Sequence, residues 1–155
     1  MTDIQSKLAE LGLSLPDTPQ PAANYVPSLQ AGDLVFLSGQ TPKIGTELRY
    51  KGKLGQDFST KEGYAAAQLC TLRLISALQA QIGNLDRVKK IVKLTVFVNG
   101  TPEFEEHALV ANGASDLLIH LFGEAGKHAR AAVGAGSLPG LCAVEIEMVV
   151  QVSTQ

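Results

Sequence analysis

The chain has 155 residues, of which 45% are hydrophobic and 18% are charged, and its mean hydropathy is +0.12. This length suits one domain, and this composition excludes an intrinsically disordered chain. The 13 basic and 15 acidic residues give a net charge of −2. Because no basic excess is present to neutralise phosphates, sequence-independent binding of nucleic acid is not expected.

Residues 1–21 are expected to form an N-terminal extension that consists of a short helix and a proline-rich connector. Thr2–Gln5 has the pattern of a capping box, and Ile4 and Leu8 recur at helical spacing. The start of the chain has no basic region followed by a long apolar run, and no later run approaches the ~20 apolar residues of a membrane helix. We therefore expect a cytoplasmic protein without a membrane segment.

The middle of the chain predicts two strands, a long helix and a third strand. The apolar run at 34–37 predicts a strand buried on both faces, and a weaker strand is expected at 47–50. A second capping box, Ser59–Glu62, opens a helix that ends at Gly83. The clearest strand is 88–98. Its expected apolar face is formed by Val92, Leu94, Val96 and Val98.

The last third predicts a helix and two strands. Thr101–Pro102 supplies an N-cap and a proline at the first helical position, so a helix is expected from there to Phe122, with Gly123 as its stop. Strands are expected at 130–135 and 143–152. The order ββαβαββ predicts an α+β fold of one domain, with one mixed sheet and two long helices on one face. Several strands are apolar on both faces, so the uncovered face predicts a homo-oligomer.

Most motifs with a known chemistry are missing from the sequence. The glycines of 134–140 have the wrong spacing for a nucleotide-binding loop, and a strand follows them. Cys70 and Cys142 stand among apolar residues, which predicts reduced buried thiols rather than a disulfide. No metal or other cofactor is expected. The three histidines, His107, His120 and His128, form no metal motif. A packed or rim role is expected for His107, and a surface or turn role for His128.

Two charged features remain inside apolar strands, where a charge is costly unless it is paired or used. Arg130 lies among small residues, and Glu145 and Glu147 share one face of the last strand. One interpretation is an Arg–Glu ion pair across neighbouring strands, or glutamates at a wet edge. The other is a carboxylate-binding arginine beside a general-base glutamate. The residues by themselves leave both interpretations open.

Five segments between residues 22 and 152 resemble the RidA family, also called YjgF-type or L-PSP endoribonuclease-like proteins, in order and spacing. The segments are 38–42, 92–98, 129–130, 138–139 and 144–147. The interval from Arg130 to Glu145, with Leu-Pro between them, is the most specific part. The resemblance implies a chorismate-mutase-like homotrimer of the bacillus type with clefts between subunits. The extension is similar to that of a longer-chain subgroup.

The resemblance also implies a function and a set of site residues. Archetypal members hydrolyse reactive 2-enamine and 2-imino acids to 2-keto acids and ammonia, without a cofactor. Arg130 takes the position of the carboxylate-binding arginine, and Glu145 that of the glutamate that positions the attacking water. Tyr25, Ser38 and Asn112 take substrate-binding positions.

The chain departs from the family pattern at two positions near the arginine. Ala132 stands where many members have a cysteine, and His128 replaces a common proline. Two alternatives to a deaminase are a non-catalytic trimer that binds small carboxylates and an endoribonuclease, as the family's older name suggests. The pI of about 5.9 and the scarcity of aromatic residues weigh against RNA as a substrate.

Overall fold

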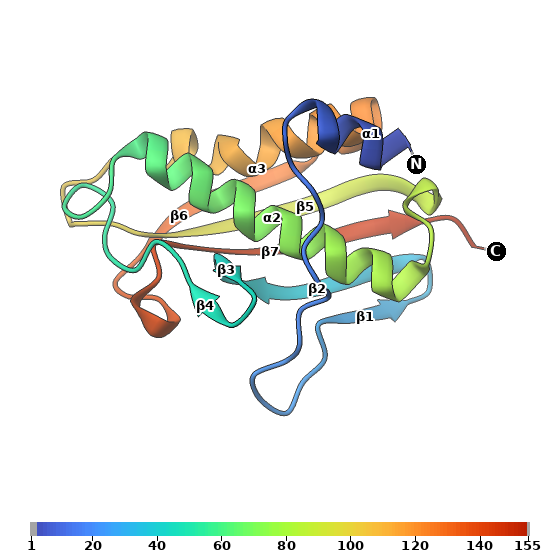
Figure 1. Cartoon of the computed structure of the whole chain (residues 1–155), viewed down its shortest axis with the longest axis horizontal. Helices are drawn as coiled ribbons and strands as arrows, with labels where there is room; N and C mark the ends of the chain where they lie inside the picture. The colour runs from blue at the N-terminus through green and yellow to red at the C-terminus, as the bar shows by residue number, and fades with distance from the viewer. Residues whose placement is uncertain (1–2, 155) are drawn as a thin grey trace.

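The computed structural model describes residues 3–154 (Figure 1). Its α-helices are α1 (Asp3–Glu10), α2 (Thr60–Ile82) and α3 (His107–Phe122). Its main sheet contains β1 (Ser28–Ala31), β2 (Leu34–Gln40), β5 (Val88–Asn99), β6 (Ala129–Ala135) and β7 (Val144–Val152). Two short strands, β3 (Lys43–Ile44) and β4 (Glu47–Leu48), pair with each other. Short 3-10 helices are η1 (Leu85–Arg87), η2 (Gly123–Gly126) and η3 (Pro139–Leu141).

The main sheet has the order β1-β2-β7-β5-β6, and its neighbouring strands are antiparallel except for the parallel pair β5 and β6. The long helices α2 and α3 pack against each other over one face of this sheet (Figure 1). The predicted α+β fold, with a mixed sheet and two long helices on one face, is therefore confirmed. Because β5 lies between β6 and β7, the last two strands of the chain are not neighbours.

The start of the sheet differs from the sequence prediction. The first strand is Ser28–Ala31, which forms a hairpin with β2 around Gly32 at φ +64°. The strand predicted at 47–50 is wrong as a member of the main sheet, because Glu47–Leu48 pairs with Lys43–Ile44. Tyr50 has a φ of +54°, which no strand accommodates. An edge strand such as β1 needs no apolar run. Because the sequence of β1 contains no such run, hydrophobic patterning did not predict this strand.

The alternation along β5 shifts at a bulge. The register against β7 changes between Ile91 and Lys93, so Ile91 is fully buried and Val92 is 36% exposed. The prediction that Val92 shares the buried face of Leu94 is therefore wrong. A bulge adds one residue to one strand of a pair, and every side chain before it then moves to the other face.

Helix α3 begins later than the sequence predicts. Its first residue is His107 rather than Pro102, whereas its end at Gly123 and the capping box of α2 at Ser59 are confirmed. The amide of Thr101 donates to the carbonyl of Leu54 at 3.0 Å, so it pairs with the loop before α2. Residues 101–104 then form a turn, in which the amide of Phe104 donates to the carbonyl of Thr101 at 3.1 Å, so no helix begins at the predicted N-cap.

Glycines allow α2 and α3 to approach closely. A Cβ atom built on Gly113 would lie 2.1 Å from the carbonyl oxygen of Tyr64 in α2. Non-bonded carbon and oxygen atoms do not approach to this distance, so any side chain at position 113 would force the two helices apart.

We expect Gly113→Ala to lower the free energy of unfolding by about 1–3 kcal/mol, the usual cost of overpacking a core. Urea unfolding followed by circular dichroism measures the change. Gly136→Ala is the matched control, because a Cβ at Gly136 has no heavy atom within 4 Å. Equal stability of the two variants would contradict the close packing of α2 on α3.

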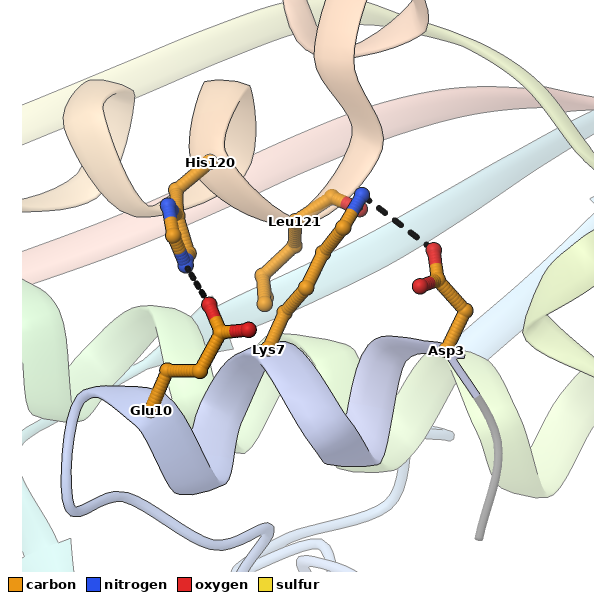
Figure 2. Close-up of polar contacts among 5 residues, drawn as sticks. All are labelled: Asp3, Lys7, Glu10, His120 and Leu121. Carbon is orange, nitrogen blue, oxygen red and sulfur yellow. Dashed lines mark hydrogen bonds and ion pairs between the residues drawn. The ribbon is translucent and has the colours of Figure 1, made fainter.

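The N-terminal extension packs on the helix layer. Ile4 and Leu8 of α1 are buried, and the predicted N-cap residue Thr2 lies outside the described residues. As Figure 2 shows, the ammonium of Lys7 lies near Asp3 and the last turn of α3, and Glu10 pairs with His120 at 3.6 Å. No helix within residues 3–154 is long and apolar enough to cross a membrane.

Candidate functional site

The guanidinium of Arg130 is held on the helix-covered side of the sheet. Arg130 is in register with Leu94, whose side chain is fully buried under the helices, so both point toward the same layer. Its Nη1 donates to Oδ1 of Asn112 at 2.8 Å and to Oγ of Ser115 at 3.1 Å. The residue remains exposed. The structure thus brings Arg130 and Asn112 together, two of the residues that the sequence singled out.

A chain of hydrogen bonds through Ser115 and His128 supports the side chain of Arg130. His128 Nδ1 lies 2.7 Å from the carbonyl oxygen of Gly126, and its Nε2 lies 2.9 Å from Ser115 Oγ. Since a carbonyl only accepts, Nδ1 carries the proton, and in the neutral ring Nε2 accepts from the Ser115 hydroxyl. The serine oxygen then accepts from Arg130. The Gly126 carbonyl, the His128 ring and the Ser115 hydroxyl thus fix the direction of the guanidinium without neutralising its charge.

No carboxylate neutralises Arg130 within residues 3–154, where every ion pair closer than 4.0 Å involves other residues. The interpretation of an Arg–Glu ion pair across neighbouring strands is therefore wrong for Arg130. Its physical reason is topological, because β5 separates β6 from β7. An exposed, oriented and uncompensated guanidinium is suited to bind an anion, above all a planar carboxylate.

Glu145 lies on the other face of the sheet. It is in register with Phe97 of β5, whereas Arg130 is in register with Leu94, and positions three apart on a strand face opposite sides. Burial, with a smaller contribution from the charge of Glu147, raises the pKa of the Glu145 carboxyl. A glutamate with a raised pKa is a stronger base than a solvated one, so Glu145 is suited to accept a proton from water.

The end of β2, where the register against β7 shifts, lies against Glu145. A Cβ on Gly39 would lie 2.8 Å from Oε2 of Glu145, so glycine gives the carboxylate its space. Tyr25 and Glu145 line one cavity of about 360 Å³, and Tyr25 and Ser38 line a neighbouring groove of about 500 Å³. The Ser38 hydroxyl donates to the carbonyl of Val26 at 2.6 Å, which holds the segment of Tyr25 against β2.

The predicted residues therefore form two half-sites on one chain. Arg130 and Asn112 make the first half-site, and Tyr25, Ser38 and Glu145 make the second. The sequence analysis missed Ser115 as a support of Arg130. Its signal was the spacing of three residues from Asn112, which places both on one side of a helix.

The two cysteines are unsuited to chemistry. Cys70 and Cys142 are free and buried, as predicted. Burial raises the pKa of the Cys142 thiol to about 11 and that of Cys70 well above its usual range. Both are protonated at neutral pH and unreactive. Within residues 3–154, no group of three metal-ligating side chains is clustered.

The chain is similar in sequence and in fold to several known proteins. Residues 5–148 match the family model described as "YjgF/chorismate mutase-like, putative endoribonuclease". The protein TCP17 of Trypanosoma cruzi is 46% identical over 151 residues, which cover 97% of this chain and 94% of TCP17. The structure of a "putative endoribonuclease" from Shewanella oneidensis is 36% identical, with a TM-score of 0.92 over 96% of this chain and 99% of that one. RidA from an Antarctic Psychrobacter shares the fold at 24% identity, with a TM-score of 0.62 over 88% of this chain and 94% of that one.

Proposed function

The chain belongs to the YjgF/chorismate mutase-like family, and on this premise we propose that it hydrolyses 2-imino and 2-enamino acids to 2-keto acids and ammonia. The observation that supports this proposal is the Arg130 guanidinium, which Asn112 and Ser115 orient and no described carboxylate neutralises. A 2-imino acid carries a carboxylate next to the electrophilic carbon of its C=N bond. An arginine that binds this carboxylate bidentately also fixes the position of the carbon.

The reaction needs one water molecule and one acid–base group. Glu145 takes a proton from water while the water oxygen bonds to the imine carbon, and the π electrons of the C=N bond move to nitrogen. The carboxylic acid of Glu145 then returns the proton to nitrogen, which gives a carbinolamine. Glu145 next takes the proton of the new hydroxyl group and passes it to the amine nitrogen. The C–N bond then breaks as the C=O bond forms, and ammonia leaves. An enamine enters the same sequence after protonation at carbon. Neither a metal nor an organic cofactor takes part.

The two half-sites cannot act on one substrate within one chain, because they lie on opposite faces of the sheet. We infer that Arg130 of one protomer meets Glu145 of a neighbour in a homotrimer. The face of the sheet away from the helices supports this assembly. It exposes large apolar side chains that another subunit would cover: Leu29, Phe36 and Val133.

Ammonia release from a freshly generated 2-imino acid tests the proposed function. The imine is produced by an amino-acid oxidase with catalase, and ammonia is measured with and without the protein. Acceleration above the spontaneous rate is expected. If the protein binds a 2-keto acid but does not accelerate ammonia release, it is a carboxylate-binding trimer and not a hydrolase. If it neither binds the keto acid nor accelerates ammonia release, both functions are excluded.

Mixing two inactive variants tests the shared site. Arg130→Ala and Glu145→Gln each lack one charged residue of the proposed cleft, so each alone is expected to have little activity. After joint unfolding and refolding, mixed trimers contain some clefts with both residues intact, and activity is expected to return. Mixing two preparations of the same variant is the control. If the mixture stays as inactive as its components, the two residues do not act across a subunit boundary.

A further inference from the structure

A cavity at the end of β2 contains positive charge that the proposed chemistry does not use. Its volume is about 360 Å³, and its wall includes Gln40, Lys43 and Arg73 besides Glu145. An adjacent cavity of about 290 Å³ shares Lys43 and Arg73 and is lined by Asp17 and its neighbours in the N-terminal connector. Two cations therefore face one carboxyl group in each cavity.

Arg73 is buried without a counter-charge. The residue is 8% exposed, and its Nε donates to Oε1 of Gln40 at 3.2 Å. Within residues 3–154, no carboxylate oxygen lies within 4.0 Å of its guanidinium or of the Lys43 ammonium. Burial lowers the pKa of Arg73. A charge withdrawn from water in this way is costly unless an anion compensates it.

The fold holds Arg73 at the wall of this cavity. The residue lies in the buried middle of α2, and its partner Gln40 is itself 7% exposed. One turn further along α2, the Ser76 hydroxyl donates to the carbonyl of Pro16 at 2.7 Å and fixes the connector over the helix. Residues of the N-terminal extension thus form part of the wall of a half-open site, and the Gln40 side chain orients the guanidinium in another part of that wall.

We propose that this cavity binds a second carboxylate on the side chain of the substrate, so that the preferred substrates are dicarboxylic 2-imino acids. The inference rests on the proposed function, because Glu145 lines the same cavity as Arg73 and Lys43. A substrate whose imine carbon meets the water held by Glu145 can extend its side chain toward Arg73. The volume of about 360 Å³ is within the range of small-molecule sites.

The test compares a dicarboxylic with a monocarboxylic 2-imino acid, derived from aspartate and from alanine. We expect the wild-type protein to favour the dicarboxylic acid, and Arg73→Met to lower the ratio of the two kcat/KM values by about 10- to 100-fold, the usual effect of losing a hydrogen bond to a charged group. Arg73→Lys should retain part of the preference. Arg49→Met is the matched control, since Arg49 is an exposed arginine that pairs with Glu47.

Calorimetry with the stable keto acids separates this inference from the proposed function. Oxaloacetate should bind more tightly than pyruvate to the wild type, and Arg73→Met should abolish the difference. Inorganic phosphate is a third ligand, and its binding in place of the diacid would identify a phosphate site and overturn the carboxylate assignment. An unchanged ratio in Arg73→Met, or a wild type without preference, would also overturn it. If no imine is hydrolysed, the proposed function fails, and the calorimetry still decides whether Arg73 binds a dicarboxylate.

Discussion

Replacing Arg130 by alanine is expected to lower kcat/KM for a 2-imino acid by about 100- to 1000-fold, because the variant loses two charge-assisted hydrogen bonds and the fixed position of the imine carbon. Both effects act on the same carboxylate, so the loss should be visible in KM and in kcat. The variant should fold normally, since Arg130 is exposed, Asn112 is only partly buried, and the buried Ser115 keeps its hydrogen bond to His128.

The measurement is ammonia release from freshly generated 2-iminopropanoate, with circular dichroism as the check on folding. Arg49→Ala is the control, because it removes an arginine elsewhere on the surface. This variant should retain wild-type kinetics. Wild-type activity in Arg130→Ala would show that the guanidinium does not bind substrate, and the proposed site would then be wrong.

The second large effect is expected at Glu145, where the change to glutamine should lower kcat by about 10²- to 10⁴-fold, because a general base is lost without a change in shape. The pH dependence of the wild type follows from the sign of the pKa shift. The base must be ionised, and burial raises its pKa, so kcat/KM should fall as the pH decreases through this raised value.

Glu147→Gln gives a sharper form of the same prediction. The charge of Glu147 contributes to the raised pKa of Glu145, so its removal should move the acidic limb of the pH profile to lower pH. A limb that stays in place, or that moves to higher pH, would show that another group is the base.

Local signals in the sequence predicted the long elements well. The capping box at Ser59 and the stop at Gly83 bound α2, and the alternation in Glu145–Met148 placed the two glutamates on one face of β7. These features depend on residues within one or two turns of each other. The predicted start of α3 was wrong because residues 101–104 form a turn, which a backbone hydrogen bond from Thr101 ties to Leu54 in a distant part of the chain.

The sequence named candidate site residues but not the strand order that separates them. Arg130 and Glu145 stood out as charges inside apolar strands, and Asn112 came from the family resemblance, yet none of these showed that β5 lies between β6 and β7. Strand order depends on which long-range pairing is most stable, and no local pattern encodes it. Arg73 escaped notice because a lone arginine in a helix resembles a solvated surface residue until its burial is known.

The central place of β5 has a consequence for how the activity responds to dilution. If the catalytic pair is divided between two protomers, a newly synthesised or highly diluted chain that has not met a partner is inert. Its specific activity then rises with protein concentration as the subunits meet, whereas an enzyme with its whole site in one chain shows the same specific activity at every concentration.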